Sequence, residues 1–149
     1  MKPANAIAVL IVDDHQVVRQ GLRTFLELHA DMTVVGEASD GAAAVDLALR
    51  LQPDVVLMDL VLPQMDGIAA TRQIKAGRPG VKVIALTSFA EDDKVFPAIQ
   101  AGASSYLLKD VTPDALVEAI RAVHRGEARL HPDIARKLMA QVAQQPGFK

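Results

Sequence analysis

Short apolar runs alternate along this chain with longer stretches in which apolar residues recur every three or four positions. The runs have the length of strands, and the stretches have the spacing of amphipathic helices. The first, third and fourth runs are continuously apolar, which is typical of strands buried on both faces of a parallel sheet. Five strands are predicted, at Ile7–Val12, Met32–Ala38, Asp54–Met58, Val81–Leu86 and Ser105–Leu108.

Five helices are predicted between and after these strands. They begin just after Asp14, at about Ala42, after Asp66 and Gly67, near Asp92 or Asp93, and at Thr112. The first should bury a stripe of Val18, Leu22, Phe25 and Leu26. Pro97 removes a backbone donor close to the start of the fourth helix and should weaken that turn. Five βα units in succession predict one α/β domain, a doubly wound, flavodoxin-like parallel sheet in the order 2-1-3-4-5 flanked by five helices.

Composition narrows the classes of function. A length of 149 residues suits one domain plus a tail. With 16 basic and 18 acidic residues, the chain lacks the positive surface that strong nucleic-acid binding requires. The absence of cysteine excludes disulfides, thiolate metal sites and cysteine nucleophiles. No apolar run approaches the roughly 18 residues that span a bilayer, and no secretory signal is recognisable, so we expect a cytoplasmic protein without membrane contact.

Polar side chains follow four of the predicted strands at the point where each strand ends. They are Asp13 and Asp14 after the first strand, Asp59 after the third, Thr87 and Ser88 after the fourth, and Lys109 and Asp110 after the fifth. The carboxyl ends of parallel strands meet at one edge of a sheet, and ligands bind there near the switch in strand order. Three carboxylates, a hydroxyl and an ammonium are therefore expected to share one pocket.

Each of these residues also has an ordinary structural explanation. Asp14 could cap the first helix, and Asp59 could be a turn former. Thr87 could be a buried hydroxyl bonded to the backbone, and Lys109 a surface residue. For any single residue the ordinary explanation is favoured by several to one. Their joint occurrence at four strand ends reverses those odds.

The expected pocket is chemically coherent. Carboxylates brought close together raise one another's pKa values unless cations are present. A lysine and a divalent ion would supply the cations, and oxygen ligands of this kind favour Mg²⁺. A carboxylate in such a pocket can attack phosphorus to give an aspartyl phosphate. The residues therefore indicate Mg²⁺-dependent phosphoryl transfer to an aspartate.

Four strings carry a specific family resemblance. They are IVDD at 11–14, LMDLVLPQMDG at 57–67, LTSF at 86–89 and SYLLKD at 105–110. In order and spacing they resemble the receiver domains of two-component response regulators, over residues 7–124. The resemblance implies that Asp59 is the phosphoacceptor and that a sensor histidine kinase supplies the phosphoryl group.

The same resemblance assigns roles to the other residues of the motifs. It implies that Mg²⁺ is held directly by Asp14, Asp59 and the backbone carbonyl of Val61, and through water by Asp13. Lys109 would pair with the phosphoryl oxygens, with Thr87 as the switch hydroxyl and Tyr106 as the switch aromatic. Asp110 stands where many receivers have a proline preceded by a cis bond, and because a cis bond to a non-proline residue costs about 3–4 kcal/mol, the sequence leaves the isomer of the Lys109–Asp110 bond open.

Two further strings, GASSYLLKD at 102–110 and RGEARLHPDIARKLM at 125–139, are similar to the NarL/FixJ class. Receivers of that class precede a LuxR-type helix-turn-helix domain and regulate transcription. Ile134, Leu138 and Val142 recur every four residues and predict an apolar stripe on an additional helix from about Pro132 to Ala143. The resemblance implies a receiver at 1–126 and a linker helix and tail at 127–149. It also implies homodimer formation on phosphorylation, and DNA contact only through an output domain absent from this chain.

Other classes of function remain as alternatives. The chain could be a stand-alone receiver that acts through protein contacts, or a pseudo-receiver that works without phosphate. Phosphatases with an aspartate nucleophile usually carry a second aspartate two residues later, where this chain has Val61, which favours a signalling switch over an enzyme. A nucleotide or flavin binder is disfavoured because no glycine-rich or Ser/Thr-rich phosphate loop follows the first strand.

Overall fold

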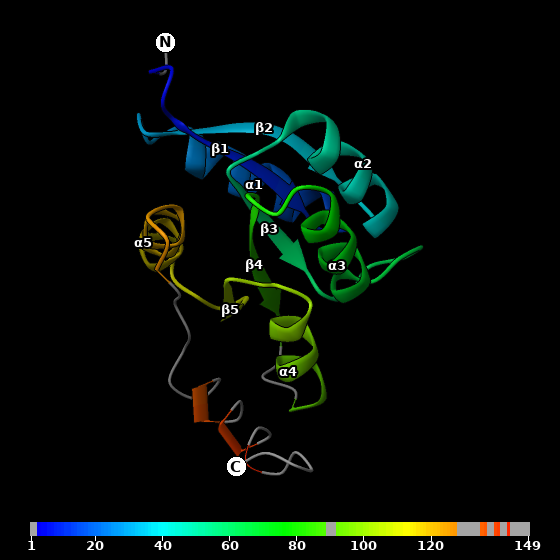
Figure 1. Ribbon diagram of the computed structural model, residues 1–149. Coiled ribbons are helices and arrows are strands. Elements are labelled where there is room, and N and C mark those ends of the chain that lie inside the picture. The colour runs from blue at the N-terminus through cyan, green and yellow to red at the C-terminus, as the bar shows by residue number, and fades with distance from the viewer. Residues whose placement is uncertain (1–2, 89–91, 128–134, 137–138, 141–142, 144–149) are drawn as a thin grey trace.

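The computed structural model describes residues 3–88, 92–127, 135–136, 139–140 and 143, and contains a five-stranded parallel sheet (Figure 1). The strand order is β2-β1-β3-β4-β5, which confirms the predicted topology. The strands are β1 Ile7–Val12, β2 Met32–Ala38, β3 Val55–Asp59, β4 Lys82–Thr87 and β5 Ser105–Leu108. Three of them match the prediction residue for residue, and β3 and β4 lie one residue later.

Asp54 explains why β3 begins one residue later than predicted. Its carboxylate accepts a hydrogen bond from the amide of Ala8 at 2.8 Å, and its carbonyl accepts one from the amide of Lys82 at 3.1 Å. Asp54 thus joins the amino-terminal ends of β1, β3 and β4, and regular pairing with β4 starts at Val55, opposite Lys82.

Among the described residues up to 127, the helices are α1 Gln16–Glu27, α2 Gly41–Leu51, α3 Gly67–Gly77, α4 Asp92–Gln100 and α5 Pro113–His124. The predicted cap of α5 is confirmed, because the Thr112 side chain accepts a hydrogen bond from the amide of Ala115. Asp40 and Asp66 cap α2 and α3 in the same way. The N-cap of α1 is His15, so the explanation of Asp14 as a helix cap is wrong.

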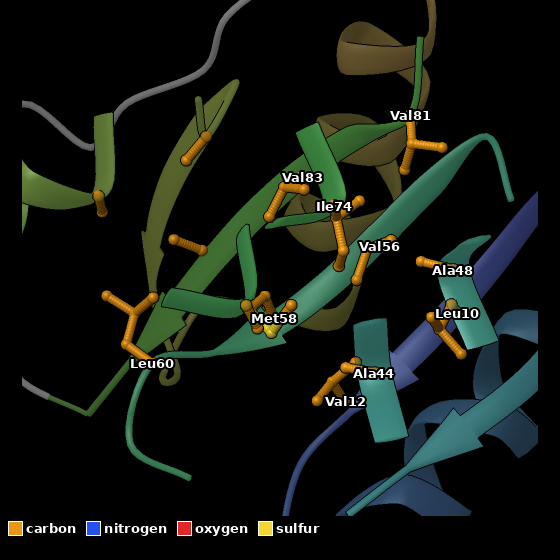
Figure 2. Packing of buried hydrophobic residues seen from close by; sticks show 14 of the residues in the cluster. Leu10, Val12, Ala44, Ala48, Val56, Met58, Leu60, Ile74, Val81 and Val83 are labelled. Carbon is orange, nitrogen blue, oxygen red and sulfur yellow. The ribbon is translucent and has the colours of Figure 1, made fainter. Parts of the chain in front are cut away.

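Helices cover both faces of the sheet, as a doubly wound fold requires. Residues of α1 and α5, among them Leu26, Leu116 and Ile120, pack on one face. The other face is covered by α2, α3 and α4, and Figure 2 shows Ala44, Ala48 and Ile74 packed against the strands there. The predicted burial of β1, β3 and β4 on both faces is confirmed, since every residue of β3 is buried.

The predicted buried stripe of α1 is correct for only part of its length. Leu26 is buried and Leu22 and Phe25 are partly buried, but Val18 is 41% exposed. The first turn of α1 faces an apolar groove instead of the core. This groove, of about 400 Å³, is lined mainly by α1 and by the start of α5, including Leu116. The periodicity of apolar residues identified the apolar face of α1. It did not indicate which part of that face packs on the sheet.

The segment after α5 is described only in part. Residues 135–136, 139–140 and 143 are helical, and lie within the linker helix predicted from about Pro132 to Ala143. The stripe predicted from Ile134, Leu138 and Val142 lies outside the described residues. In the described part of the chain, no helix combines the length and apolar character needed to cross a bilayer.

Candidate functional site

The register of the sheet brings the predicted site residues to one edge. Val12 pairs with Met58, so the next residues of the two strands, Asp13 and Asp59, follow side by side. Asp59 pairs with Leu86 in β4, the residue before Thr87. Thr87 pairs with Leu108 in β5, and its carbonyl accepts a hydrogen bond from the Lys109 amide at 2.7 Å. The carboxyl ends of four strands thus meet here.

The side chain of Lys109 joins two carboxylates at this edge. Its Nζ donates to Oδ2 of Asp59 at 2.8 Å and lies 3.1 Å from Oδ2 of Asp13. Both aspartates are 3% exposed, whereas the lysine side chain is 26% exposed. The ammonium therefore approaches the carboxylates from the mouth of the pocket and neutralises part of a buried negative charge.

Burial and hydrogen bonding act in opposite directions on these charges. Burial raises the pKa of Asp59 above its ordinary value, although hydrogen bonds from Lys109 and from the amide of Val61 both lower it. For Lys109, burial lowers the pKa, but hydrogen bonds to Asp59 and Asp13 outweigh burial and raise it overall. The lysine is therefore fully charged at neutral pH, while ionised Asp59 is held at an energetic cost that a further cation would reduce.

The loop after β1 gathers three possible metal ligands. A carboxylate oxygen of Asp13, one of Asp14 and a ring nitrogen of His15 lie within 4.8 Å of one another. The His15 Nδ1 is 3.1 Å from Asp13 and 3.0 Å from Asp14. Among the described residues this group does not include Asp59, which Lys109 connects to Asp13 instead. The two carboxylates are oxygen donors of the kind that Mg²⁺ prefers, whereas an imidazole nitrogen suits transition metals better.

The loop between β3 and α3 packs closely around Asp59. The Val61 amide donates to Oδ1 of Asp59 at 3.0 Å, and the Val61 side chain is 61% exposed. Gly67 lies against the Asp59 backbone, where a Cβ would overlap the carbonyl of Asp59. The amide of Gly67 in turn donates to the carbonyl of Leu60 at 3.1 Å. These contacts fix the backbone from Asp59 to Val61.

The two predicted switch residues are both buried. Thr87, at the end of β4, is 2% exposed, and Tyr106 in β5 is fully buried. Tyr106 belongs to the core cluster under α2, α3 and α4, together with Ala98 of α4 and Ala103. The bond between Lys109 and Asp110, whose isomer the sequence left open, is trans.

A family comparison agrees with this geometry. The sequence model of the family described as the response regulator receiver domain matches residues 9–121. The chain belongs to this family. The match spans β1 to α5 and includes Asp13, Asp59 and Lys109, so the receiver fold and the strand-end pocket occur in the same part of the chain.

Individual receivers and regulators resemble the chain over most of its length. It is 52% identical over 136 residues to the transcriptional regulatory protein LiaR of Bacillus subtilis, covering 91% of this chain and 64% of LiaR. It is 44% identical over 132 residues to the response regulator protein VraR of Staphylococcus aureus, covering 89% of this chain and 63% of VraR. A crystal structure of a LuxR-family two-component response regulator from Aurantimonas sp. SI85-9A1 matches with a TM-score of 0.83 and 36% identity, covering 93% of this chain and 99% of that one.

These matches confirm the resemblance to response regulators of the LuxR class. The chain spans less than two thirds of the length of LiaR and of VraR. The receiver is thus the part that this chain shares with longer regulators.

Three residues around the pocket were missed by the sequence analysis. His15 contacts both loop aspartates, Arg19 donates to the carbonyl of Asp13, and Glu37 binds Arg19. His15 could have been predicted as a pocket residue because it directly follows Asp13 and Asp14. The sequence positions of Arg19 and Glu37 gave no such signal. The pairing of Arg19 with Glu37 depends on how α1 lies against β2, which no local pattern specifies.

Proposed function

We propose that the chain is the phosphorylation switch of a two-component regulator, in which Asp59 accepts a phosphoryl group from a sensor histidine kinase. The observation that carries this proposal is the pair of contacts made by Lys109, whose ammonium joins the carboxylates of Asp59 and Asp13. A buried carboxylate beside a fixed cation and an acidic loop has the groups that phosphoryl transfer to aspartate requires.

In the proposed reaction, a carboxylate oxygen of Asp59 attacks the phosphorus atom of a phosphohistidine. The new O–P bond replaces the P–N bond, whose electron pair leaves with the imidazole, and the imidazole takes up a proton. The Lys109 ammonium, already 2.8 Å from Oδ2 of Asp59, can follow the negative charge onto the phosphoryl oxygens. Burial of Asp59 limits the access of water to the acyl phosphate.

The proposed direct ligands of Mg²⁺ are Asp14, Asp59 and the carbonyl of Val61, with Asp13 acting through water. Bound Mg²⁺ neutralises charge that develops on the phosphoryl group. The closeness of Asp13 to Asp14 and the raised pKa of Asp59, caused mainly by burial, support a cation in this pocket. The His15 imidazole lies beside the same carboxylates and is the neighbour best placed to affect the choice of metal.

Thr87 and Tyr106 are the proposed switch residues. A phosphoryl group on Asp59 would attract the Thr87 hydroxyl from the neighbouring strand end. Both residues are buried in the neighbouring strands β4 and β5, and in this proposal movement of Thr87 would be followed by a change in the packing of Tyr106 and in the surface of α4, β5 and α5. Phosphorylation would thereby bias a two-state equilibrium and favour a homodimer.

The proposed organisation is a receiver at 1–126 followed by a linker at 127–149 that leads to a LuxR-type DNA-binding domain. The greater length of LiaR and VraR, and the description of LiaR as a transcriptional regulatory protein, support this arrangement. In this proposal the chain is a cytoplasmic signalling switch, not a turnover enzyme, and DNA is bound only by the output domain.

The test is to incubate the chain with Mg²⁺ and acetyl phosphate and to measure its intact mass and oligomeric state. Wild type should gain the mass of one phosphoryl group, and Asp59→Asn should not. Asp110→Asn is the matched control, because Asp110 is an exposed aspartate next to Lys109. Equal modification of wild type and Asp59→Asn would contradict the proposal.

A further inference from the structure

Asp13 is held by contacts from outside the pocket as well as by Lys109 inside it. Its carbonyl accepts a hydrogen bond from Nη1 of Arg19 at 2.6 Å, and its amide donates to the carbonyl of Ala38 at 3.1 Å. Its Oδ1 accepts from the amide of His15 at 2.8 Å. The loop that carries Asp13 and Asp14 is therefore fixed by α1 and by the end of β2, in addition to Lys109 on the pocket side.

A carboxylate on β2 holds Arg19 in this position. Nε of Arg19 donates to Oε1 of Glu37 at 3.1 Å, and Oε2 of Glu37 accepts from Nη1 of Arg23 at 2.6 Å. The side chains of Arg19 and Glu37 are 15% and 23% exposed, whereas that of Arg23 is 47% exposed. Arg19 is thus the partly buried cation of the network, while Arg23 is more exposed and, in the described part of the chain, donates to the other oxygen of Glu37.

These contacts close a ring around the base of the acidic loop. Glu37 and Ala38 are consecutive residues of β2, so Asp13 is tied to the same piece of strand through its own amide and through Arg19. A guanidinium can serve two acceptors at once because its donors lie in a rigid plane. A lysine ammonium is a compact point charge and does not reproduce that geometry.

We propose that the Arg19–Glu37 pair is a positioning element for the divalent-cation pocket. By fixing the carbonyl of Asp13, it holds the carboxylates of Asp13 and Asp14 where they can receive Mg²⁺. The inference rests on the proposed Mg²⁺-dependent function and adds to it two residues that contact neither metal nor phosphoryl group. Groups that orient metal ligands from behind typically change metal affinity by about 10- to 100-fold when removed.

A repulsive role for the Arg19 charge and a positioning role for Arg19 predict changes of opposite sign in the Kd for Mg²⁺. If the Arg19 charge acted only by repelling a nearby cation, its removal would tighten Mg²⁺ binding. If Arg19 were only a structural contact, its removal would lower the free energy of unfolding and leave the affinity of the folded protein unchanged. Loss of positioning instead weakens Mg²⁺ binding by the folded protein. The direction of the change in Kd therefore separates the three roles.

The experiment measures the Kd for Mg²⁺ by isothermal titration calorimetry, with urea denaturation of each variant to ensure that only folded protein is compared. Arg19→Gln and Arg19→Lys should both weaken binding, by about 10-fold. Glu37→Gln should give a smaller loss, because its amide oxygen still accepts from Arg19. Arg23→Gln is the matched control, since it removes a cation from the same carboxylate without touching the loop, and its Kd should equal that of wild type.

Unchanged or tighter binding in Arg19→Gln would overturn the positioning role, and so would full rescue by Arg19→Lys. If Arg19→Gln does not fold, Arg19→Lys and Glu37→Gln carry the same test. Failure of the proposed function would give a different result. Wild type would then bind no Mg²⁺, or wild type and Asp59→Asn would be phosphorylated to the same extent. Wild-type binding and phosphorylation with an unaltered Kd in the Arg19 variants would overturn the positioning role alone.

Discussion

Gly41, the first residue of α2, lies directly against the backbone carbonyl of Met65 in the loop between β3 and α3. A Cβ at Gly41 would overlap that carbonyl and also approach the Met65 side chain. The loop that follows Asp59 is therefore packed under the start of α2, and a glycine is needed where the two backbones meet.

Gly41→Ala is expected to destabilise the protein by about 1–3 kcal/mol, the usual cost of overpacking a close contact. The matched control is Gly21→Ala in α1, where a Cβ meets nothing within 4 Å. The control should be stabilised by about 0.5–1 kcal/mol through the higher helix propensity of alanine. Urea denaturation of the two variants measures both effects, and a stable Gly41→Ala protein would show that the loop can move away.

The stability of the metal-free protein should depend on the ionisation of Asp59. Because burial raises its pKa in the folded state, the contribution of Asp59 to stability is fully present below its unfolded pKa and is lost as pH rises through its folded pKa. Asp59→Asn lacks this ionisation. In EDTA, the variant should therefore gain stability relative to wild type as pH rises from acid to neutral. A stability difference between the two that is independent of pH would contradict this prediction.

Removal of the Lys109 ammonium should be costly at neutral pH. Lys109→Met leaves the buried carboxylates of Asp13 and Asp59 without the cation that joins them, a loss of about 1–3 kcal/mol. The loss should diminish in acid, where Asp59, whose pKa is raised by burial, becomes protonated. Arg50→Met is the control, because Arg50 forms an exposed ion pair with Asp46 worth at most about 0.5 kcal/mol. Equal losses for the two variants in urea denaturation at pH 7 would argue against a special role for Lys109.

A second pH-dependent contribution to the free energy of unfolding comes from Asp31, which connects the loop before β2 to Arg121 in α5. Hydrogen bonds from Arg121, at 2.8 and 3.2 Å, lower the pKa of Asp31. The stability it contributes is therefore present above its unfolded pKa and is lost as pH falls through its lowered folded pKa. Asp31→Asn should cost about 0.2–1 kcal/mol at pH 7, since the pair is partly exposed, and nothing in strong acid. Thermal unfolding across this pH range measures the difference.

The sequence was sufficient for the topology because burial of a parallel strand on both faces leaves a continuous apolar run, as in β1. It was insufficient where a distant side chain decides a boundary. Asp54 was assigned to β3, but its carboxylate binds Ala8, which lies 46 residues earlier in the chain. The exposure of Val18 was missed for a related reason, since periodicity does not state how far α1 extends past the sheet.

The candidate site was predictable to a similar degree. Strand ends and the order of the strands indicated that Asp13, Asp59 and Lys109 share one edge of the sheet, and they do. The particular pairing, in which one ammonium contacts both carboxylates, depends on side-chain conformations. The contacts of Arg19 with Glu37 and with the Asp13 carbonyl depend on the placement of α1 against β2, and they appear only in three dimensions.

The ion pair between Lys109 and Asp13 connects the carboxyl end of β1 to the carboxyl end of β5. Sequence-distant contacts of this kind slow folding, because the entropy of closing the long intervening chain opposes their formation. A chain cut before β5 would keep every acidic residue of the pocket and lose their internal cation. Such a fragment would have to bury its carboxylates without a neutralising cation or expose them to water. Cation binding at this edge of the sheet therefore depends on assembly of the whole sheet.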